Sequence, residues 1–190
     1  MRPSTRWALI AAAVLAGVGG AAVYLAELSV PPPPAAGCRQ ELSLIDDDGS
    51  ELPAAVYRCE AATSRRPAML VWADTPRRAR PAVRAFDFWA RGGRSLWVVE
   101  TPPRPDALER QVLAALEMLA EDPWVDPAGI TLVGGASLLP LAAEPPGRVR
   151  VVLVLEGGST AVSGTADGVE VVAGGWNSET LGALAERLAD

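Results

Sequence analysis

The stretch Ile130-Thr131-Leu132-Val133-Gly134-Gly135-Ala136-Ser137-Leu138 decides how the rest of the chain is organised. Its first four residues are apolar or β-branched, which predicts a short buried strand. The two glycines allow a sharp turn, and the residues from Ser137 onward predict a short helix. Because α/β proteins place their sites at the ends of such strands, this stretch is also the first place to look for a functional site.

The composition argues against a Ser-His-Asp relay. The chain of 190 residues contains no His and no Lys, so all 17 basic residues are Arg. Such a relay needs an imidazole that takes the serine proton near neutral pH, and Lys is the usual substitute base. The formal net charge is −6. The sequence shows neither a basic stripe nor an aromatic ladder, so we expect no nucleic-acid partner.

Residues 1–28 are expected to be a membrane anchor or a signal sequence. Residues 7–26 form an uncharged, mostly apolar run preceded by Arg2 and Arg6, and this run is long enough to span a bilayer as a helix. Arginines before a span place the N-terminus in the cytoplasm and the following chain outside it. We therefore expect a single-pass protein of the inner membrane whose domain faces the periplasm or the cell exterior.

Two alternatives would change this localisation. A cleaved signal peptide would release a secreted protein, although its apolar region is normally only about 7–15 residues long. A lipoprotein would carry lipid on Cys38, since residues 35–38 resemble a lipobox that lacks its usual Leu. In all three cases residues 29–37 form a linker. The four prolines at 31–34 favour an extended spacer that holds the domain away from the membrane.

Residues 38–59 are expected to form a β-hairpin around Asp48-Gly49, which is a strong two-residue turn signal. Cys38 and Cys59 lie at equal distances along the chain from this turn. In a two-residue hairpin they would face each other with Cα atoms about 4.5 Å apart, a separation that a disulfide can bridge. Outside the cytoplasm this predicts a structural disulfide. The alternatives are two unrelated thiols, or Cys38 as a lipid site.

The remaining residues are expected to complete one α/β domain, residues 38–190. The expected parallel strands are residues 68–72, 95–99, 130–133, 148–155 and 169–172. The expected helices are residues 81–91, 106–120 with Asp106 as N-cap, and 178–188. Strands that alternate with helices predict a parallel sheet flanked by helices on both faces, here preceded by the N-terminal hairpin.

From the hairpin to the C-terminus, the sequence resembles the dienelactone-hydrolase branch of the α/β-hydrolase superfamily. The resemblance covers about three quarters of the chain. The stretches that carry it are the Asp-Gly hairpin, Ala90-Arg91-Gly92-Gly93, residues 116–133 with Pro123-Trp124-Val125-Asp126-Pro127 inside, and Gly164-Thr165-Ala166-Asp167. It implies a truncated α/β-hydrolase fold without a cap, because the segment between Leu155 and Val169 is too short for one.

The sequence departs from the family where the family's chemistry would lie. The family's nucleophile elbow reads G-x-S-x-G, and here the nucleophile position is Ala136 and the last glycine is Leu138. The family's histidine maps near Trp176, and its oxyanion loop maps to residues 72–75. Only the acid keeps a counterpart, Asp167. The resemblance therefore implies a degenerate elbow and loss of the ancestral reaction.

Other residues could still carry chemistry. Ser137 could be a displaced nucleophile with Asp167 as its acid, although a serine at this place more often caps a helix. Asp74, Glu100 and Glu156 each follow a predicted parallel strand, where ligands bind in open α/β sheets. Converging carboxylates could hold a divalent cation or a cationic ligand. We favour helix caps and solvated loop acids instead, and we predict neither a metal nor a cofactor.

Arginine and tryptophan side chains are frequent around the same strand ends. The arginines could neutralise the acids, meet an anionic headgroup, or form a solvated surface; they are Arg77, Arg78, Arg80 and Arg84. The tryptophans are expected to pack in the core or at its rim; they are Trp72, Trp97, Trp124 and Trp176.

Two functions remain. The first is a membrane-tethered, catalytically inactive domain that binds a small molecule or a protein outside the cytoplasm. The alternative is an active, esterase-like hydrolase of atypical chemistry that uses Ser137 or an unrecognised site.

Overall fold

A computed structural model describes residues 38–45, 48–59, 64–147, 149–155 and 168–189. The predicted anchor, the linker, Glu156 and Asp167 lie outside these residues. Within the described ranges, no helix is both long enough and apolar enough to cross a membrane.

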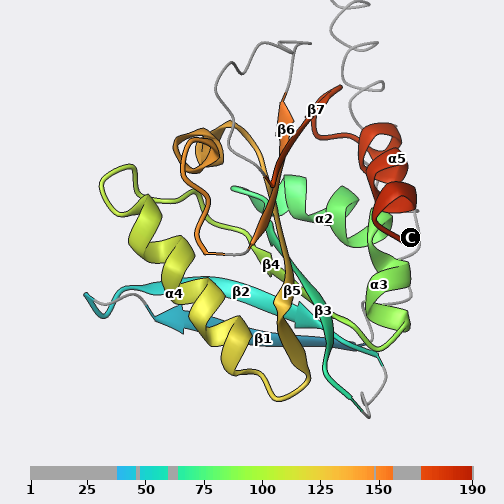
Figure 1. Ribbon diagram of the computed structural model, residues 1–190, viewed down its shortest axis with the longest axis horizontal. Helices are drawn as coiled ribbons and strands as arrows, with labels where there is room; N and C mark the ends of the chain where they lie inside the picture. The colour runs from blue at the N-terminus through green and yellow to red at the C-terminus, as the bar shows by residue number, and fades with distance from the viewer. Residues whose placement is uncertain (1–37, 46–47, 60–63, 148, 156–167, 190) are drawn as a thin grey trace, which may run out of the picture. The chain divides into compact units, whose positions relative to one another are not determined.

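Seven strands of the described chain form one sheet in the order β1-β2-β4-β3-β5-β6-β7 (Figure 1). They are β1 (Arg39–Ile45), β2 (Glu51–Tyr57), β3 (Arg66–Trp72), β4 (Ser95–Val99), β5 (Val125–Gly134), β6 (Arg150–Leu155) and β7 (Val169–Ala173). The strands from β3 to β7 are parallel, whereas β2 is antiparallel to both β1 and β4. The sequence predicted a hairpin followed by a parallel sheet, and this holds only for the strands from β3 to β7. The hairpin forms the edge of a mixed sheet, because residues 54–57 pair with residues 96–99.

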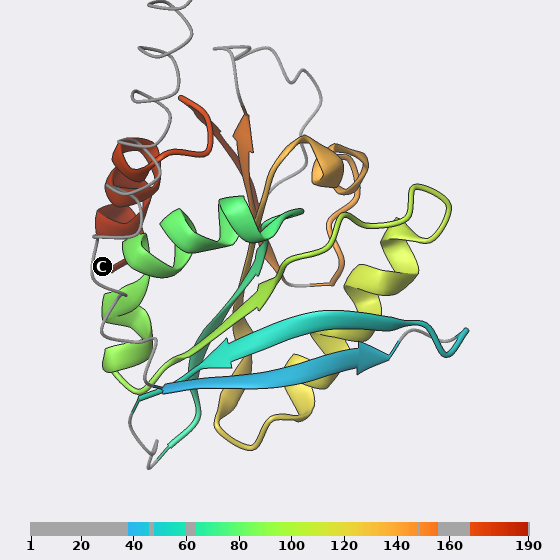
Figure 2. The ribbon, with the colours of Figure 1, turned by 180° about the vertical axis from the view of Figure 1, so that it is seen from behind.

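Helices cover both faces of this sheet (Figures 1 and 2). One face is packed by α2 (Pro76–Ala85), α3 (Asp87–Arg91) and α5 (Ser178–Ala189), and the other by α4 (Leu108–Glu121) and the 3-10 helix η2 (Ala136–Ala142). Successive residues of β3 alternate between the two cores, and every residue from Ala68 to Ala73 is buried. A strand buried on both faces has a continuous apolar sequence, which is why this strand was recognisable.

The hairpin turn differs from its prediction. Ile45 pairs with Glu51, so the connection has five residues rather than two. A two-residue type I′ turn needs a positive φ at both of its central residues. Among the described residues of this turn only Gly49 has a positive φ, 80°. The Asp-Gly signal therefore marks a turn of greater length, and the register of the whole hairpin shifts by one residue.

The predicted disulfide is confirmed in spite of this shift. The backbone N–H of Arg58 donates to the carbonyl of Cys38, so Cys38 lies opposite Arg58 and not opposite Cys59. Cys38 and Cys59 are nevertheless bonded, with Cα atoms 4.8 Å apart, because disulfides accept Cα separations of about 4.4–6.8 Å. The N–H of Cys59 also donates to the carbonyl of Ala90, which joins the end of the hairpin to α3.

The first helical segment starts earlier than predicted. The hydroxyl of Thr75 accepts a hydrogen bond from the N–H of Arg78, and Pro76 occupies the first turn, where a missing N–H costs nothing. This N-terminus places Pro81 inside α2 rather than at its start. The predicted helix of residues 81–91 is therefore replaced by the end of α2 and the separate helix α3.

The predicted helix of residues 106–120 is confirmed as α4, but the predicted N-cap is wrong. Ala107 is the N-cap and makes no side-chain capping bond, so Asp106 does not cap the helix. The N–H of Ala107 is already bonded to the carbonyl of Arg104 in a preceding turn, which moves the start of the helix along the chain. The predicted apolar stripe is buried; it consists of Leu108, Val112, Ala115, Leu116 and Leu119.

Candidate functional site at the strand ends

The elbow after β5 has the backbone of a strand-to-helix turn but no hydroxyl at its tip. Gly134 ends β5 and Gly135 is the N-cap of η2. A Cβ on Gly134 would lie only 2.8 Å from Cγ of the buried Leu138, so glycine is required for the chain to fold back this closely. Ala136, at the nucleophile position, is exposed. The predicted helix is present as a 3-10 helix that begins at Ala136 and contains Pro140.

Asp74 directs its carboxylate toward this elbow. It lies beyond β3 and has a φ of 61°, the only positive φ among the non-glycine residues that the structure describes. Asp is one of the few residues that adopt this left-handed conformation readily. The conformation turns the chain from β3 toward α2 and leaves the Asp74 side chain only 14% exposed.

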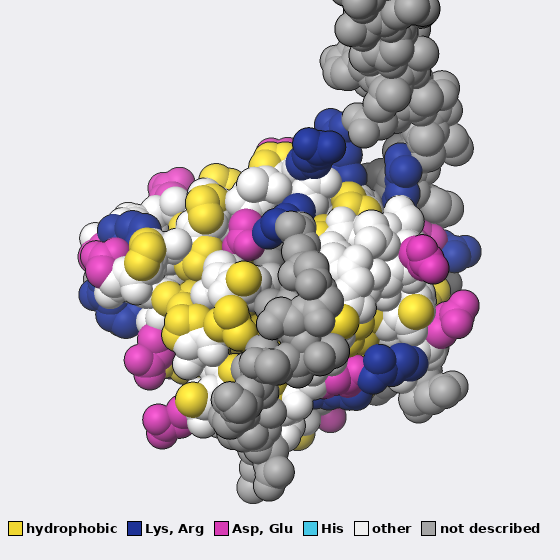
Figure 3. Space-filling model, turned by 90° about the horizontal axis from the view of Figure 1, so that it is seen from above, with side chains coloured by type: hydrophobic (Ala, Val, Ile, Leu, Met, Phe, Trp, Pro, Cys, Tyr) yellow, Lys and Arg dark blue, Asp and Glu magenta, His cyan; other side chains and the backbone are white. Residues whose placement is uncertain are grey.

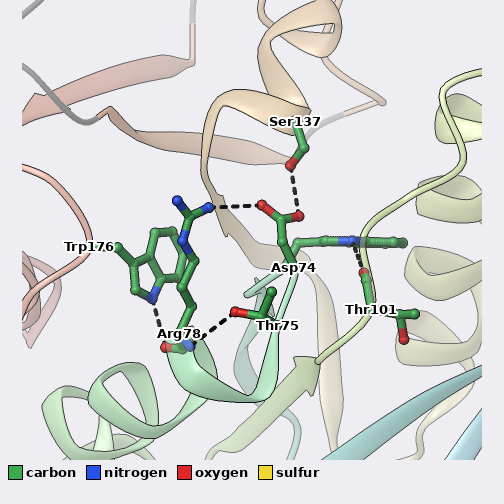
Figure 4. Close-up of polar contacts among 7 residues, drawn as sticks. Asp74, Thr75, Arg78, Thr101, Ser137 and Trp176 are labelled. Carbon is green, nitrogen blue, oxygen red and sulfur yellow. Dashed lines mark hydrogen bonds and ion pairs between the residues drawn. The ribbon is translucent and has the colours of Figure 1, made fainter. Parts of the chain in front are cut away.

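Ser137 is the hydroxyl partner of Asp74. Its Oγ donates to Oδ1 of Asp74 over 2.9 Å (Figure 4). The helix-capping role that we favoured for Ser137 is wrong, because Gly135 is the N-cap and η2 has no side-chain capping bond. The Ser137 side chain instead links η2, which follows β5, to Asp74, which follows β3.

Arg78 and Trp176 complete the arrangement. Nη1 of Arg78 lies 3.3 Å from Oδ2 of Asp74, and the indole N–H of Trp176 donates to the backbone carbonyl of Arg78 over 2.7 Å (Figure 4). Trp176 follows β7, so these contacts join the ends of β3, β5 and β7. We call Asp74, Arg78, Ser137 and Trp176 the strand-end cluster. It brings together the segments that the resemblance assigns to the oxyanion loop, the nucleophile and the histidine.

The charges at this end of the sheet are mixed. Arg78 neutralises Asp74, one of the roles that we considered for the arginines. Figure 3 views the molecule from the end toward which β6 points, and acidic and basic side chains are interspersed there with hydrophobic ones. On the part of this face that the described residues form, neither sign of charge predominates, so this part produces no single-sign field that would steer a charged ligand.

Glu100 lies in a different place from the strand-end cluster. It lines a groove of about 460 Å³ over the hairpin, whose other lining residues are Arg39, Glu41, Leu42, Ser43, Pro53 and Ala54. Burial raises the pKa of the Tyr57 phenol, and the negative charge of Glu100 adds to this rise. In the ranges that the structure covers, no three acidic, His or Cys side chains lie together as a metal site would require.

Sequence reasoning missed most of these contacts. The Ser137–Asp74 and Trp176–Arg78 hydrogen bonds join residues 63 and 98 positions apart, and no local pattern predicts them. Two local signals were available. Asp74 and Arg78 have the i, i+4 spacing of an ion pair, and Thr75-Pro76 is a typical helix start.

The strand order, the helices on both faces and the elbow after β5 define an α/β-hydrolase fold. A protein from Klebsiella pneumoniae subsp. pneumoniae described as a dienelactone hydrolase has a TM-score of 0.50 to this chain at 14% identity, over 80% of each chain. The fold is therefore dienelactone-hydrolase-like, as the sequence predicted. An identity this low supports the fold alone.

Two further solved structures have lower TM-scores to this chain. A hyperthermophilic esterase from Pyrobaculum calidifontis has a TM-score of 0.46 at 15% identity, over 82% of this chain and 57% of its own. Oligopeptidase B from Leishmania major has a TM-score of 0.45 at 12% identity, over 64% of this chain. The chain spans only 20% of that peptidase. No protein-family model matches the sequence, and a search of curated proteins finds no match either.

Proposed function

We propose that this chain is a membrane-tethered α/β-hydrolase-like domain without catalytic activity, which binds a small molecule or a protein outside the cytoplasm. Residues 1–28 are the anchor and residues 29–37 the linker. The observation that supports this most is that the polar groups of the strand-end cluster bond to one another. The hydroxyl of Ser137 and the guanidinium of Arg78 both bond to Asp74, and Trp176 bonds to the backbone of Arg78. An active hydrolase pairs its nucleophile with a base that can take the proton near neutral pH, whereas the Ser137 hydroxyl is paired with a carboxylate that is itself paired with Arg78.

The charge beside Ser137 also opposes acyl transfer. Attack on an ester creates an oxyanion, which must be stabilised by N–H or O–H donors. Asp74 lies 2.9 Å from the Ser137 hydroxyl, and an ionised carboxylate only accepts hydrogen bonds. This carboxylate therefore supplies no donor for the developing oxyanion. With no His or Lys in the sequence, the chain also lacks the usual bases.

The alternative is an esterase-like hydrolase with Ser137 as nucleophile, and one observation favours it. The 2.9 Å hydrogen bond would let Asp74 take the Ser137 proton directly. However, a carboxylate is a much weaker base than an imidazole near neutral pH, so this dyad would be a poor one. Asp167, the acid that the resemblance suggests, lies outside the described residues.

A reactivity experiment separates these functions. The purified chain is expected neither to react with a fluorophosphonate probe nor to hydrolyse short aryl esters faster than a buffer control. Ala136→Ser is expected to stay inactive, because the base is still missing. Ala136→Ser combined with Trp176→His supplies both groups and is expected to recover a trace of labelling. If the unmodified chain is labelled and Ser137→Ala abolishes the labelling, the alternative function is correct.

The tether is tested by the mass of the mature protein. We expect an N-terminus upstream of residue 7 and no lipid, since Sγ of Cys38 is bonded to Cys59 and cannot also carry a lipid thioether. A mature N-terminus between residues 20 and 38 would remove the anchor from the proposal. A lipidated Cys38 would instead identify a lipoprotein.

A further inference from the structure

Helix α2 presents a row of arginines to solvent. It contains four arginines and no acidic residue, and three of the four are exposed: Arg77, Arg80 and Arg84. At about 100° per residue, these positions fall within roughly 60° of one another around the helix. We call them the arginine stripe. The buried residues of α2 lie on the opposite side of the helix. Figure 2 shows α2 lying over one face of the sheet.

Within the described residues, the side chains of the stripe are unpaired. No ion pair or side-chain hydrogen bond joins any of its three residues to the rest of the described chain. Like charges three or four positions apart destabilise a helix. This concentration of positive charge also occurs in a chain whose net charge is −6. An anionic surface that lies outside the domain would relieve the repulsion.

We propose that the arginine stripe docks on anionic phospholipid headgroups of the membrane in which the chain is anchored. This proposal rests on the tether described under the proposed function. The sequence between anchor and domain is residues 29–37. A polyproline-like segment of this length reaches only about 28 Å, at about 3.1 Å per residue. The tether therefore keeps the domain beside the bilayer. The high effective concentration of lipid there allows even a weakly binding surface to stay bound.

The chemistry of the stripe fits phosphate. The guanidinium of Arg is planar and forms paired hydrogen bonds with phosphate oxygens. Near an anionic bilayer each basic residue strengthens binding by about fivefold, so three residues give roughly 100-fold. Because α2 starts just after Asp74 and Thr75, docking would also hold the strand-end cluster close to the membrane surface.

The sequence indicated these arginines and, among their roles, contact with an anionic headgroup, but it did not predict that they form a stripe on one helix. Its expected helix began at Pro81, so Arg77 and Arg80 would have lain in a loop. The N-cap at Thr75 adds a turn and a half to the helix and brings all three arginines onto one side.

The test uses the full chain inserted in nanodiscs of phosphatidylcholine, with and without phosphatidylglycerol. Phenylglyoxal modifies exposed arginines, and mass spectrometry measures the modification at each position. We expect phosphatidylglycerol to slow modification of the arginine stripe several-fold at low salt and not at high salt, because salt screens the attraction. Arg65 and Arg110 are exposed elsewhere and serve as controls that should not change.

Hydrogen exchange of residues 76–85 extends the test to variants. Phosphatidylglycerol should slow this exchange in the unmodified chain and not in Arg77→Gln/Arg80→Gln/Arg84→Gln. A matched variant, Arg39→Gln/Arg65→Gln/Arg110→Gln, loses the same charge and should keep the effect.

Three outcomes would overturn the proposal: equal protection in both lipids, equal loss in the two triple variants, or protection in native membranes but in neither nanodisc. The last outcome would identify a protein as the occupant. If the chain does not insert into nanodiscs, the proposed tether is wrong. Flotation of the soluble chain with phosphatidylglycerol vesicles then tests the lipid proposal alone. Salt-sensitive flotation would support the lipid proposal, and absence of flotation would overturn it.

Discussion

Replacement of Trp72 by alanine is expected to lower the free energy of unfolding by roughly 3–5 kcal/mol. Trp72 is fully buried, at 0% exposure, in the core between the sheet and α4. Its indole N–H donates to the carbonyl of Thr101 over 2.9 Å. The substitution leaves a large cavity and an unpaired carbonyl. Urea denaturation followed by circular dichroism measures the loss.

The matched control is Trp124→Ala, because the same side chain is removed from a site that is 39% exposed. We expect it to cost clearly less than Trp72→Ala, since more than a third of its surface already contacts water. Equal losses in the two variants would contradict the packing described for β3. Trp72 also precedes Ala73 and Asp74, so the Trp72→Ala variant should loosen the strand-end cluster as well.

The fold could be predicted from the sequence because its signals are local. Strands β3, β4 and β6 contain continuous apolar runs at residues 68–72, 96–99 and 151–155, and all five predicted strands are present with end points moved by a few residues. One error arises where a distant contact decides the outcome. The hairpin joined the sheet through pairing of β2 with β4, a contact that no local pattern specifies.

The candidate site could be located from the sequence, but its contacts could not be predicted. The glycine pair 134–135 marks the elbow, and the absence of His is a property of composition. The orientation of Asp74 depends on its left-handed backbone, and the hydrogen bond to Ser137 depends on the placement of β3 beside β5. These are properties of tertiary structure. The arginine stripe is different, because it follows from the local cap at Thr75, which starts α2 early.

The disulfide is expected to contribute roughly 3 kcal/mol to the stability of the domain. Cys38 and Cys59 are separated by 21 positions, and the entropy that a cross-link of this length removes from the unfolded chain corresponds to about that value. The bond closes the open end of the hairpin, and Cys59 connects that end to Ala90 of α3. Its loss should therefore free the edge strand β1 first.

Two measurements check this. Protein purified from an oxidising compartment, denatured without reductant, should show no titratable thiol, and reductant should lower its denaturation midpoint. The variant Cys38→Ser/Cys59→Ser should match the reduced protein and should not respond to reductant, which controls for effects of the reductant itself. Two free thiols in the protein as isolated would contradict the bond. Equal midpoints with and without reductant would contradict the expected contribution of the disulfide to stability. Strand β1 would then be held in the sheet by its pairing with β2 alone.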